Sequence, residues 1–241
     1  MTPQELFKAG KLSEAIGALN EELRRNPADT KARTFLFELL CFSGEYDRAE
    51  KQLAVLSQPG KQSELGALLY RGALSATRAR EDLFQKKEFP KLVSQDGHDG
   101  SVSGILNGKP FQTLVDVDPR IGANLEVFVA GNYFWIPFSF LSSIEISPPK
   151  RLRDLLWIPA IIRTSPAYHD KELGETLLPA LTPFSGTHTD DYVRLGRETS
   201  WEEDENGQSY PVGQKLLLAD DEEVPILEVR KLEFTTRAEV S

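Results

Sequence analysis

Apolar residues recur every three to four positions through the first 90 residues, which is the period of an amphipathic α-helix. One segment with this pattern, residues 30–43, is apolar over most of its circumference, so we expect it to be the most buried. The pattern predicts five helices in all, at residues 2–9, 12–25, 30–43, 46–57 and 62–88.

The helical half contains an internal repeat of 34 residues, which is the spacing of the tetratricopeptide repeat. In such a repeat a small residue lets two antiparallel helices pack closely, and a large apolar residue four positions later fills the groove beside it. The sequence therefore predicts a tetratricopeptide-like helical array. The positions that carry the repeat are Gly10, Leu12, Ala15 and Leu19, which recur as Gly44, Tyr46, Ala49 and Leu53.

The helical pattern ends before Pro90, because proline has no N–H group with which to continue a helix. A polar, glycine-rich run follows, and such runs are typical of joints between domains. We therefore predict a helical tetratricopeptide-like domain at residues 1–93, a linker at 94–100 and a β-rich domain at 101–241.

Beyond the linker the pattern changes to short runs of β-branched and aromatic residues, which are typical of strands. Asn107-Gly108 and Gly131-Asn132 are expected to form the tight turns of two hairpins. We expect the last three strands of this region to lie side by side and to nucleate the domain. The predicted strands are 102–106, 110–117, 125–129, 133–136 and 140–146.

Toward the C-terminus, residues 191–197 are interpreted as a strand or a turn into one. Residues 214–219 and 224–234 predict a closing hairpin around the acidic residues 220–223. The predicted fold class is therefore α+β, with an N-terminal tetratricopeptide-like helical array followed by a β-rich α+β domain. We expect this domain to be an irregular barrel or a bent antiparallel sheet with one or two small helices.

The composition, with 40% hydrophobic and 27% charged residues, is ordinary for a soluble protein. No run approaches the ~18 apolar residues of a membrane helix, and the N-terminus lacks the apolar core of a signal peptide. We therefore expect a cytoplasmic protein without membrane insertion. Cys41 is the only cysteine, and its place in the most apolar predicted helix indicates a small buried side chain rather than a nucleophile.

The net charge of −9 is unevenly distributed. Residues 1–90 carry 14 Lys and Arg against 13 Asp and Glu, whereas residues 91–241 carry 14 against 24. An acidic surface repels phosphate groups, so nucleic acid and anionic membranes are not expected partners. The acidic runs 202–205 and 220–223 are interpreted as solvated hairpin ends.

The common catalytic templates are absent from the sequence, including the glycine-rich phosphate-binding loops, HExxH, GxSxG and paired CxxC motifs. The three histidines, His98, His169 and His188, fall in predicted loops with no second histidine or cysteine two or four positions away. We therefore expect no catalytic residue, no metal ligand and no cofactor.

An enzyme that depends on a metal or a small molecule remains an alternative. It would require a cleft in the β-rich domain, where five dispersed polar residues converge. For Asp116 and Asp118, the simpler interpretation is an edge strand that leaves the core, with Asp118 capping the turn at Pro119-Arg120. The five residues are Asp116, Asp118, Asp154, Arg194 and His188.

Four arginines in the β-rich domain lie close in sequence to carboxylates and tryptophans. Bidentate pairing with a carboxylate or stacking on an indole is typical of arginine in such surroundings. We expect these side chains to brace the β-rich domain, with ligand binding as the alternative. They are Arg151, Arg153, Arg194 and Arg197, beside Asp154, Trp157 and Trp201.

Several short segments occur in an order that, together with the 34-residue repeat, resembles the ImpE family. These proteins, also called TagJ or SciE, are accessory proteins of bacterial type VI secretion, and the resemblance runs nearly end to end. The segments are RTFLFELLC at 33–41, GEYDRA at 44–49, VDVDPR at 115–120, WIPF at 135–138, RDLLW at 153–157 and LGRETSW at 195–201.

The resemblance implies a non-enzymatic accessory protein that binds the N-terminal helix of the small sheath subunit, TssB, near the action of the recycling ATPase ClpV. The chain departs from the family at 76–80, where relatives tend to have an acidic residue before the arginines. We therefore do not expect this chain to form the ion pair that relatives make at this position. The concave face of a tetratricopeptide-like layer suits an amphipathic helix, and the β-rich domain is an equal alternative.

The candidate partner-binding residues come from both predicted domains. A monomer and a homodimer remain open, and a structural scaffold that dimerises through exposed aromatic residues such as Tyr133 or Trp135 is a further alternative. The candidates for partner binding are Arg33, Phe37, Leu40, Trp135, Arg194 and Trp201.

Overall fold

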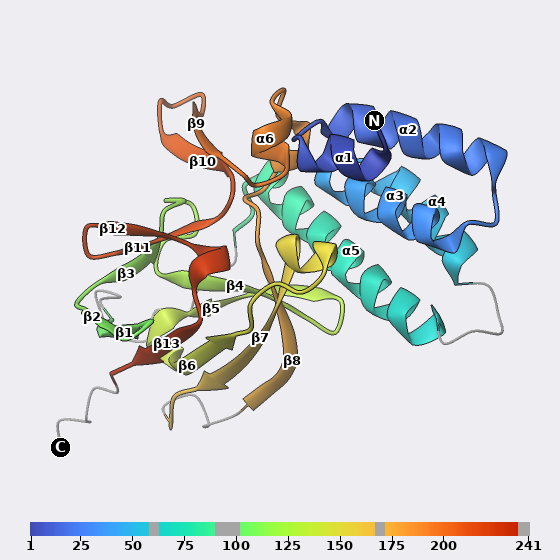
Figure 1. Ribbon diagram of the computed structural model, residues 1–241. Helices are drawn as coiled ribbons and strands as arrows, with labels where there is room; N and C mark the ends of the chain where they lie inside the picture. Colours follow the sequence, from blue (N-terminus) through green and yellow to red (C-terminus); the bar gives the residue numbers. More distant parts are fainter. Residues whose placement is uncertain (58–62, 90–101, 167–171, 236–241) are drawn as a thin grey trace, which may run out of the picture.

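A computed structural model describes residues 1–57, 63–89, 102–166 and 172–235 (Figure 1). Five α-helices form the N-terminal part and confirm the predicted helices, with ends that agree within two residues. They are α1 (Pro3–Lys8), α2 (Leu12–Arg25), α3 (Thr30–Phe42), α4 (Tyr46–Leu56) and α5 (Ser63–Lys86). No helix in the described ranges has the length and apolar character needed to span a bilayer.

The alanines and leucines that carry the 34-residue repeat lie in the hydrophobic core of the helices. Ala15 on α2 and Ala49 on α4 are fully buried, and the leucines four positions later, Leu19 and Leu53, are almost completely buried. The small side chains allow neighbouring helices to approach, and the leucines fill the space beside them. This is the packing predicted from the repeat.

Helix α3 is the most buried of the five helices, as predicted. It packs against α2 and α4, and another of its faces meets the β-rich part, where the Phe37 ring lies 6.4 Å from the Trp157 ring. Burial also raises the pKa of the Cys41 thiol well above its ordinary value, which agrees with an inert side chain. The helical face on which a partner helix was expected is therefore covered, at α3, by the protein's own β-rich part.

An eight-stranded antiparallel sheet forms the centre of the β-rich part (Figure 1). Its strand order is β2-β1-β13-β6-β7-β8-β4-β5. The strands are β1 (Gly104–Leu106), β2 (Lys109–Phe111), β4 (Asn124–Val129), β5 (Asn132–Pro137), β6 (Leu141–Ile146), β7 (Trp157–Thr164), β8 (Glu172–Pro179) and β13 (Lys231–Phe234).

Two smaller sheets and a short helix complete the β-rich part. One sheet has the order β12-β11-β3, with β3 (Leu114–Asp116), β11 (Leu216–Ala219) and β12 (Glu222–Pro225). The other is the ribbon of β9 (Thr199–Glu203) and β10 (Ser209–Gly213), and α6 (Asp191–Arg194) precedes it. Apolar residues of the large sheet, such as Ile144 and Ile162, share one core with Leu217 of β11 and Val224 of β12.

The two predicted hairpins are confirmed, as β1–β2 and β4–β5, although the turn of the second is Ala130-Gly131 rather than Gly131-Asn132. Several other pairings differ from the prediction. Strand β6 does not lie beside β4 and β5, because β7 and β8 are inserted between them. Strand β7, which contains Pro159, was not predicted. The ladder between β6 and β7 ends at Ile146 and Ala160, so Pro159 has only β8 beside it and its missing N–H breaks no bond to β6.

Two further predictions in the β-rich part were wrong in detail, and one of two alternatives is decided. Residues 110–117 split into β2 and β3, which belong to different sheets. Residues 191–197 form a turn that leads into β9 rather than a strand, because the Asp190 side chain accepts a hydrogen bond from the Tyr192 N–H and caps the single helical turn α6. The closing hairpin is β11–β12, and a turn of 3₁₀ helix at Ile226–Glu228 redirects the chain so that β13 pairs with β1 and β6.

The helical and β-rich parts share one hydrophobic cluster, in which Phe128, Trp157 and Leu195 join residues of the helices. Their backbones also meet directly, since a Cβ atom placed on Gly186 would lie 2.5 Å from the Gly44 nitrogen. A side chain at Gly186 would therefore push the two parts apart. The predicted linker at 94–100 lies outside the described residues, so the domain boundary stays a prediction.

Candidate functional site

A buried arginine joins the helical part to the large sheet. Arg80 on α5 donates hydrogen bonds of 2.7 and 2.6 Å to the two carboxylate oxygens of Glu126 on β4, and a third of 2.9 Å to the Leu181 carbonyl. Both charged side chains are almost completely removed from solvent. Sequence analysis carried over no ion pair at this part of α5, and the structure supplies one from a strand 46 residues away.

A second cation and a second carboxylate extend the pair. Lys215 Nζ donates to Glu126 Oε2 over 2.6 Å and also contacts the Asp116 carboxylate. The Tyr133 hydroxyl donates to Glu126 Oε1 and accepts a hydrogen bond from the Trp135 indole. Two cations and two carboxylates thus form a buried charge network that is neutral in sum.

The buried charge network sets the protonation of its members. Burial alone would raise the pKa of Glu126, but the charges of Arg80 and Lys215 outweigh it and lower the pKa to about 2. Burial raises the pKa of Asp116 to about 6, although Lys215 opposes this. Burial and the neighbouring Glu126 charge also raise the pKa of Tyr133, so its hydroxyl stays protonated. Because Glu126 is ionised and fully paired, the network serves as a connection between the two parts of the fold rather than as a proton donor.

Three of the four arginines singled out in the sequence, Arg153, Arg194 and Arg197, contact residues near or within the helical part. Arg194 donates to the Gly186 carbonyl, to Asp191 and to Ser13 Oγ at the start of α2. Arg197 donates to the carbonyls of Phe7 and Lys8 on α1. The prediction that these two brace the β-rich domain internally is therefore corrected, since they join it to the helices.

The third arginine, Arg153, lies 3.6 Å from the Asp154 carboxylate and 5.4 Å from the Tyr70 ring on α5. No arginine or lysine stacks on an indole in the described parts of the chain. Trp157, which was expected beside this arginine, instead donates its indole N–H to Thr77 Oγ1 over 3.0 Å. These contacts also connect the β-rich part to the helices.

The five residues of the alternative enzyme site have separate partners. Asp118 forms a bidentate pair with Arg120 and caps its backbone N–H, which confirms the predicted turn. The Asp154 carboxylate accepts two backbone N–H groups of its own loop, and His188 Nδ1 accepts the N–H of Asp190. Over the described ranges, no group of three or more His, Cys, Asp or Glu side chains is placed to hold a metal ion.

The six candidate partner-binding residues differ widely in accessibility. Phe37 and Leu40 are fully buried, so a partner cannot contact their side chains in this conformation. Arg33 is half-buried and donates to Gln52 and to the Pro27 carbonyl. The remaining three are Trp135, Arg194 and Trp201.

Of these three, only Trp201 presents a large exposed surface, with 47% of its area accessible. Trp135 is half-buried, and its ring stacks on Phe89 at 5.8 Å. Arg194 is bound at the junction with the helices, as described above. Tyr133 and Trp135 are thus engaged within the protein, and neither is a free aromatic surface of the kind that the dimeric scaffold requires.

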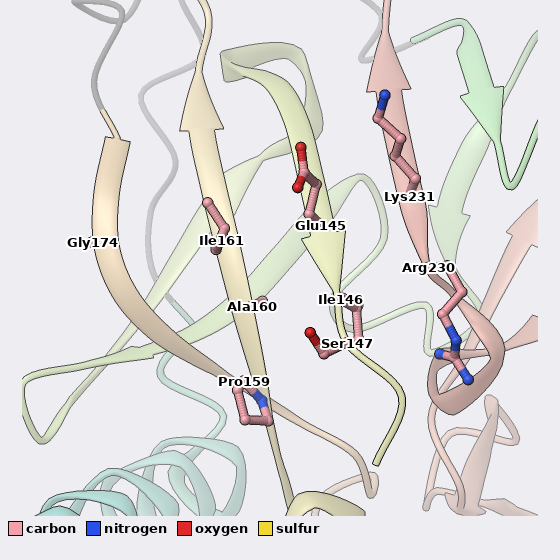
Figure 2. A pocket seen from close by; sticks show the side chains of 9 residues that line it. All are labelled: Glu145, Ile146, Ser147, Pro159, Ala160, Ile161, Gly174, Arg230 and Lys231. Atoms are coloured by element: carbon pink, nitrogen blue, oxygen red, sulfur yellow. The ribbon is translucent and has the colours of Figure 1, made fainter. Parts of the chain in front are cut away.

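A shallow groove of about 820 Å³ crosses the outer face of the large sheet (Figure 2). Lys231 on β13, Glu145 on β6 and Ile161 on β7 lie directly opposite one another on neighbouring strands, so they form one row across the groove. Ile161, the apolar residue of this row, is 45% exposed. On β8 the row continues at Glu175, which pairs with Ile161, and the neighbouring Gly174, with φ of +71°, lines the groove.

Sequence reasoning missed the groove, although a signal for it exists. In the run from Ile158 to Ile162, the residues that face either side of a strand are all apolar. In a strand with one solvated face, apolar residues normally alternate with polar ones. Ile158, Ala160 and Ile162 are buried in the core between the sheets, and Ile161 points to the other face. An apolar residue at a strand position that points toward solvent indicates either a covered face or a binding surface.

Comparison with known proteins gives consistent matches. The model of the family described as "ImpE protein" matches residues 108–233, and that of the tetratricopeptide repeat matches residues 6–71. A curated relative, the type VI secretion system accessory component TagJ of Pseudomonas aeruginosa, is 32% identical over 97% of this chain and 91% of its own length. The crystal structure of protein VPA1032 from Vibrio parahaemolyticus has the same fold, with a TM-score of 0.82 and 22% identity over 98% of both chains.

Proposed function

Since the chain belongs to the ImpE family, we propose that it is a non-enzymatic accessory adaptor of a bacterial type VI secretion system. Its partner in this proposal is the N-terminal helix of the small sheath subunit, TssB. Binding of that helix modulates assembly of the contractile sheath or its disassembly by ClpV. The adaptor acts in the cytoplasm.

The observation that carries the proposal is the exposed row across the sheet groove. Ile161 lies open to solvent beside the charged pair Glu145 and Lys231, and on its other side β8 adds Glu175 to the row and Gly174 to the groove lining. An amphipathic helix binds by laying an apolar stripe on such a surface, while its flanking polar residues pair with the charges at the rim. The groove therefore supplies both the apolar contact and the polar rim that a helix requires.

The enclosed α3 favours this location over the helical layer. Phe37 and Leu40 are committed to the core, and Trp157 packs against Phe37. Docking of a helix on that face would require the shared hydrophobic cluster and the buried charge network to open. Docking in the sheet groove requires neither, so the groove is the less costly site.

The proposal is tested by titrating the full-length protein with a peptide of the ~20 N-terminal residues of the TssB encoded with it, which spans about 30 Å as a helix. Isothermal calorimetry should show saturable binding at micromolar or lower concentration. Ile161→Glu should weaken binding at least tenfold, which corresponds to about 1.4 kcal/mol. Making the apolar stripe of the peptide polar should abolish binding.

Ile105→Glu on β1 is the matched control, because Ile105 is 43% exposed and does not line the groove. This variant should bind the peptide like the wild type. Absence of binding to the wild type would contradict the adaptor proposal. If both variants lost affinity for the peptide equally while the wild type bound it, the proposed location in the groove would be contradicted.

A further inference from the structure

The ribbon formed by β9 and β10 stands apart from the two larger sheets, beside α6 (Figure 1). One face of this ribbon packs against the rest of the protein. Tyr210 donates to Glu202 across the ribbon, and its ring lies 4.2 Å below the guanidinium of Arg120. Arg120 in turn lies 5.0 Å from the Phe84 ring on α5, so this face is held against the junction of the two parts.

The other face of the ribbon carries Trp201 and Glu203, which point the same way because they are two positions apart on one strand. Trp201 lies opposite Pro211 and Glu203 lies opposite Ser209. Both side chains are exposed. The face they share is therefore open to solvent.

Trp201 differs from the other two tryptophans of the chain. Trp135 stacks on Phe89, and Trp157 packs on Phe37 and donates its N–H to Thr77. For Trp201, the described part of the structure contains neither a stacked ring nor an acceptor for its indole N–H. A large aromatic surface and a hydrogen-bond donor are thus both left available to a partner.

Glu203 is the carboxylate of the ribbon without a partner among the described residues. Glu202 accepts from Tyr210, the Asp204 carboxylate accepts two backbone N–H groups of its own turn, and Glu205 pairs with Lys87. Residues 199–213 contain no lysine or arginine that competes for Glu203. Its charge therefore remains uncompensated beside the open indole.

We propose that Trp201 and Glu203 form a binding site for an arginine side chain of a protein partner. A guanidinium is planar, so it stacks on the indole face and its in-plane N–H groups donate to a carboxylate about 7 Å further along the strand. Lysine offers a compact charge without the planar surface, and an anionic partner is repelled by the four carboxylates of the ribbon. The site lies on a different surface from the sheet groove and is independent of helix binding there.

The test is a titration of the full-length, ¹⁵N-labelled protein followed through its three indole N–H signals by NMR. The probe is the peptide acetyl-Gly-Ser-Arg-Ser-Gly-amide, and its control is the same peptide with citrulline, which keeps the shape of arginine and removes the charge. Trp201→Phe assigns the signal of interest by its loss. We expect the Trp201 signal to shift saturably with the arginine peptide, at least fivefold less with the citrulline peptide, and the other two signals to stay in place.

Glu203→Gln should weaken the binding of the arginine peptide at least threefold. Glu223→Gln is the matched control, because it removes the same charge from the exposed tip of the β11–β12 hairpin and should leave binding unchanged. The signals of Trp135 and Trp157 report whether each variant is folded. A stationary Trp201 signal, equal shifts with both peptides, or equal effects of the two substitutions would each overturn the proposal.

Discussion

Replacing Arg80 with leucine tests the role of the buried charge network. The substitution removes both hydrogen bonds from Arg80 to Glu126 and leaves the Leu181 carbonyl without that donor. Glu126 keeps Lys215 and Tyr133, but it loses its bidentate partner in a site without access to water. Breaking a buried ion pair from one side typically costs about 3–5 kcal/mol, because the remaining charge is no longer compensated.

For a chain of this length, a loss of that size corresponds to a decrease in melting temperature of roughly 6–20 °C. The free energy of unfolding is measured by urea titration, followed by far-ultraviolet circular dichroism and by tryptophan fluorescence. Coincident transitions from the two probes are required, since only then does a single free energy describe the protein.

Arg78→Leu is the matched control on the same helix. Arg78 forms ion pairs of 2.8 and 3.1 Å with Asp47 and Glu50, but these side chains are exposed. Surface pairs contribute at most about 1 kcal/mol, so this variant should remain close to the wild type.

The double variant Arg80→Leu with Glu126→Leu completes a cycle. Replacing both partners with apolar side chains should recover much of the loss, because no unpaired charge remains between them and Lys215 keeps Asp116. The reasoning would be refuted by an Arg80→Leu cost below about 1 kcal/mol, or by a double variant whose cost equals the sum of the two single costs.

Three further outcomes follow from the structure. Trp157→Ala should cost about 3–5 kcal/mol in urea unfolding, because the indole is buried and bonded to Thr77; a cost below 1 kcal/mol would contradict this. Ala49→Glu places a carboxylate in a fully buried position and should abolish the helical circular dichroism of the N-terminal part at 25 °C, which a wild-type melting curve would disprove. The pKa of Asp116 is raised by burial from about 3.8 to about 6 on folding, so the native state binds this proton more tightly than the unfolded state. The stability of the wild type relative to Asp116→Asn should therefore fall by about 2 kcal/mol between pH 4 and pH 7, and urea titrations that show the opposite slope would refute the assignment.

Glu126 has the opposite pH dependence. Its pKa is lowered from about 4.5 to about 2 on folding, so its contribution to stability is complete above pH 4.5 and is lost as the pH falls toward 2. As the pH falls, the Asp116 contribution is therefore gained between about pH 6 and 3.8 and the Glu126 contribution is lost between about pH 4.5 and 2, and comparison with the single variants separates them.

The helical part illustrates what local patterning predicts well. Each of its helices has an apolar stripe with the period of its own backbone, and the repeat at Ala15 and Ala49 places the helix contacts without knowledge of the rest of the chain. The two tight-turn hairpins were predictable for the same reason, since a turn dipeptide and its flanking strands are neighbours in sequence.

The candidate surfaces were much less predictable. Trp201 was named in advance, but nothing local distinguishes it from Trp135, which is half-buried against Phe89. Ile161 was missed because β7 was not predicted, and because the exposure of one face of a strand depends on which distant segments cover the sheet. Phe37 and Leu40 were chosen for an open groove and lie inside the molecule.

The sequence by itself determined the helical layer, the short hairpins, the unequal charge of the two halves and the resemblance to the family. Only the tertiary structure decided that β7 and β8 separate β4 from β6, that Arg80 meets Glu126, and that α3 is covered by the β-rich part. The physical reason is the range of the interactions. Helix periodicity and turn preference act over a few residues, whereas strand order, burial of charge and exposure of a face depend on which distant segments pack together.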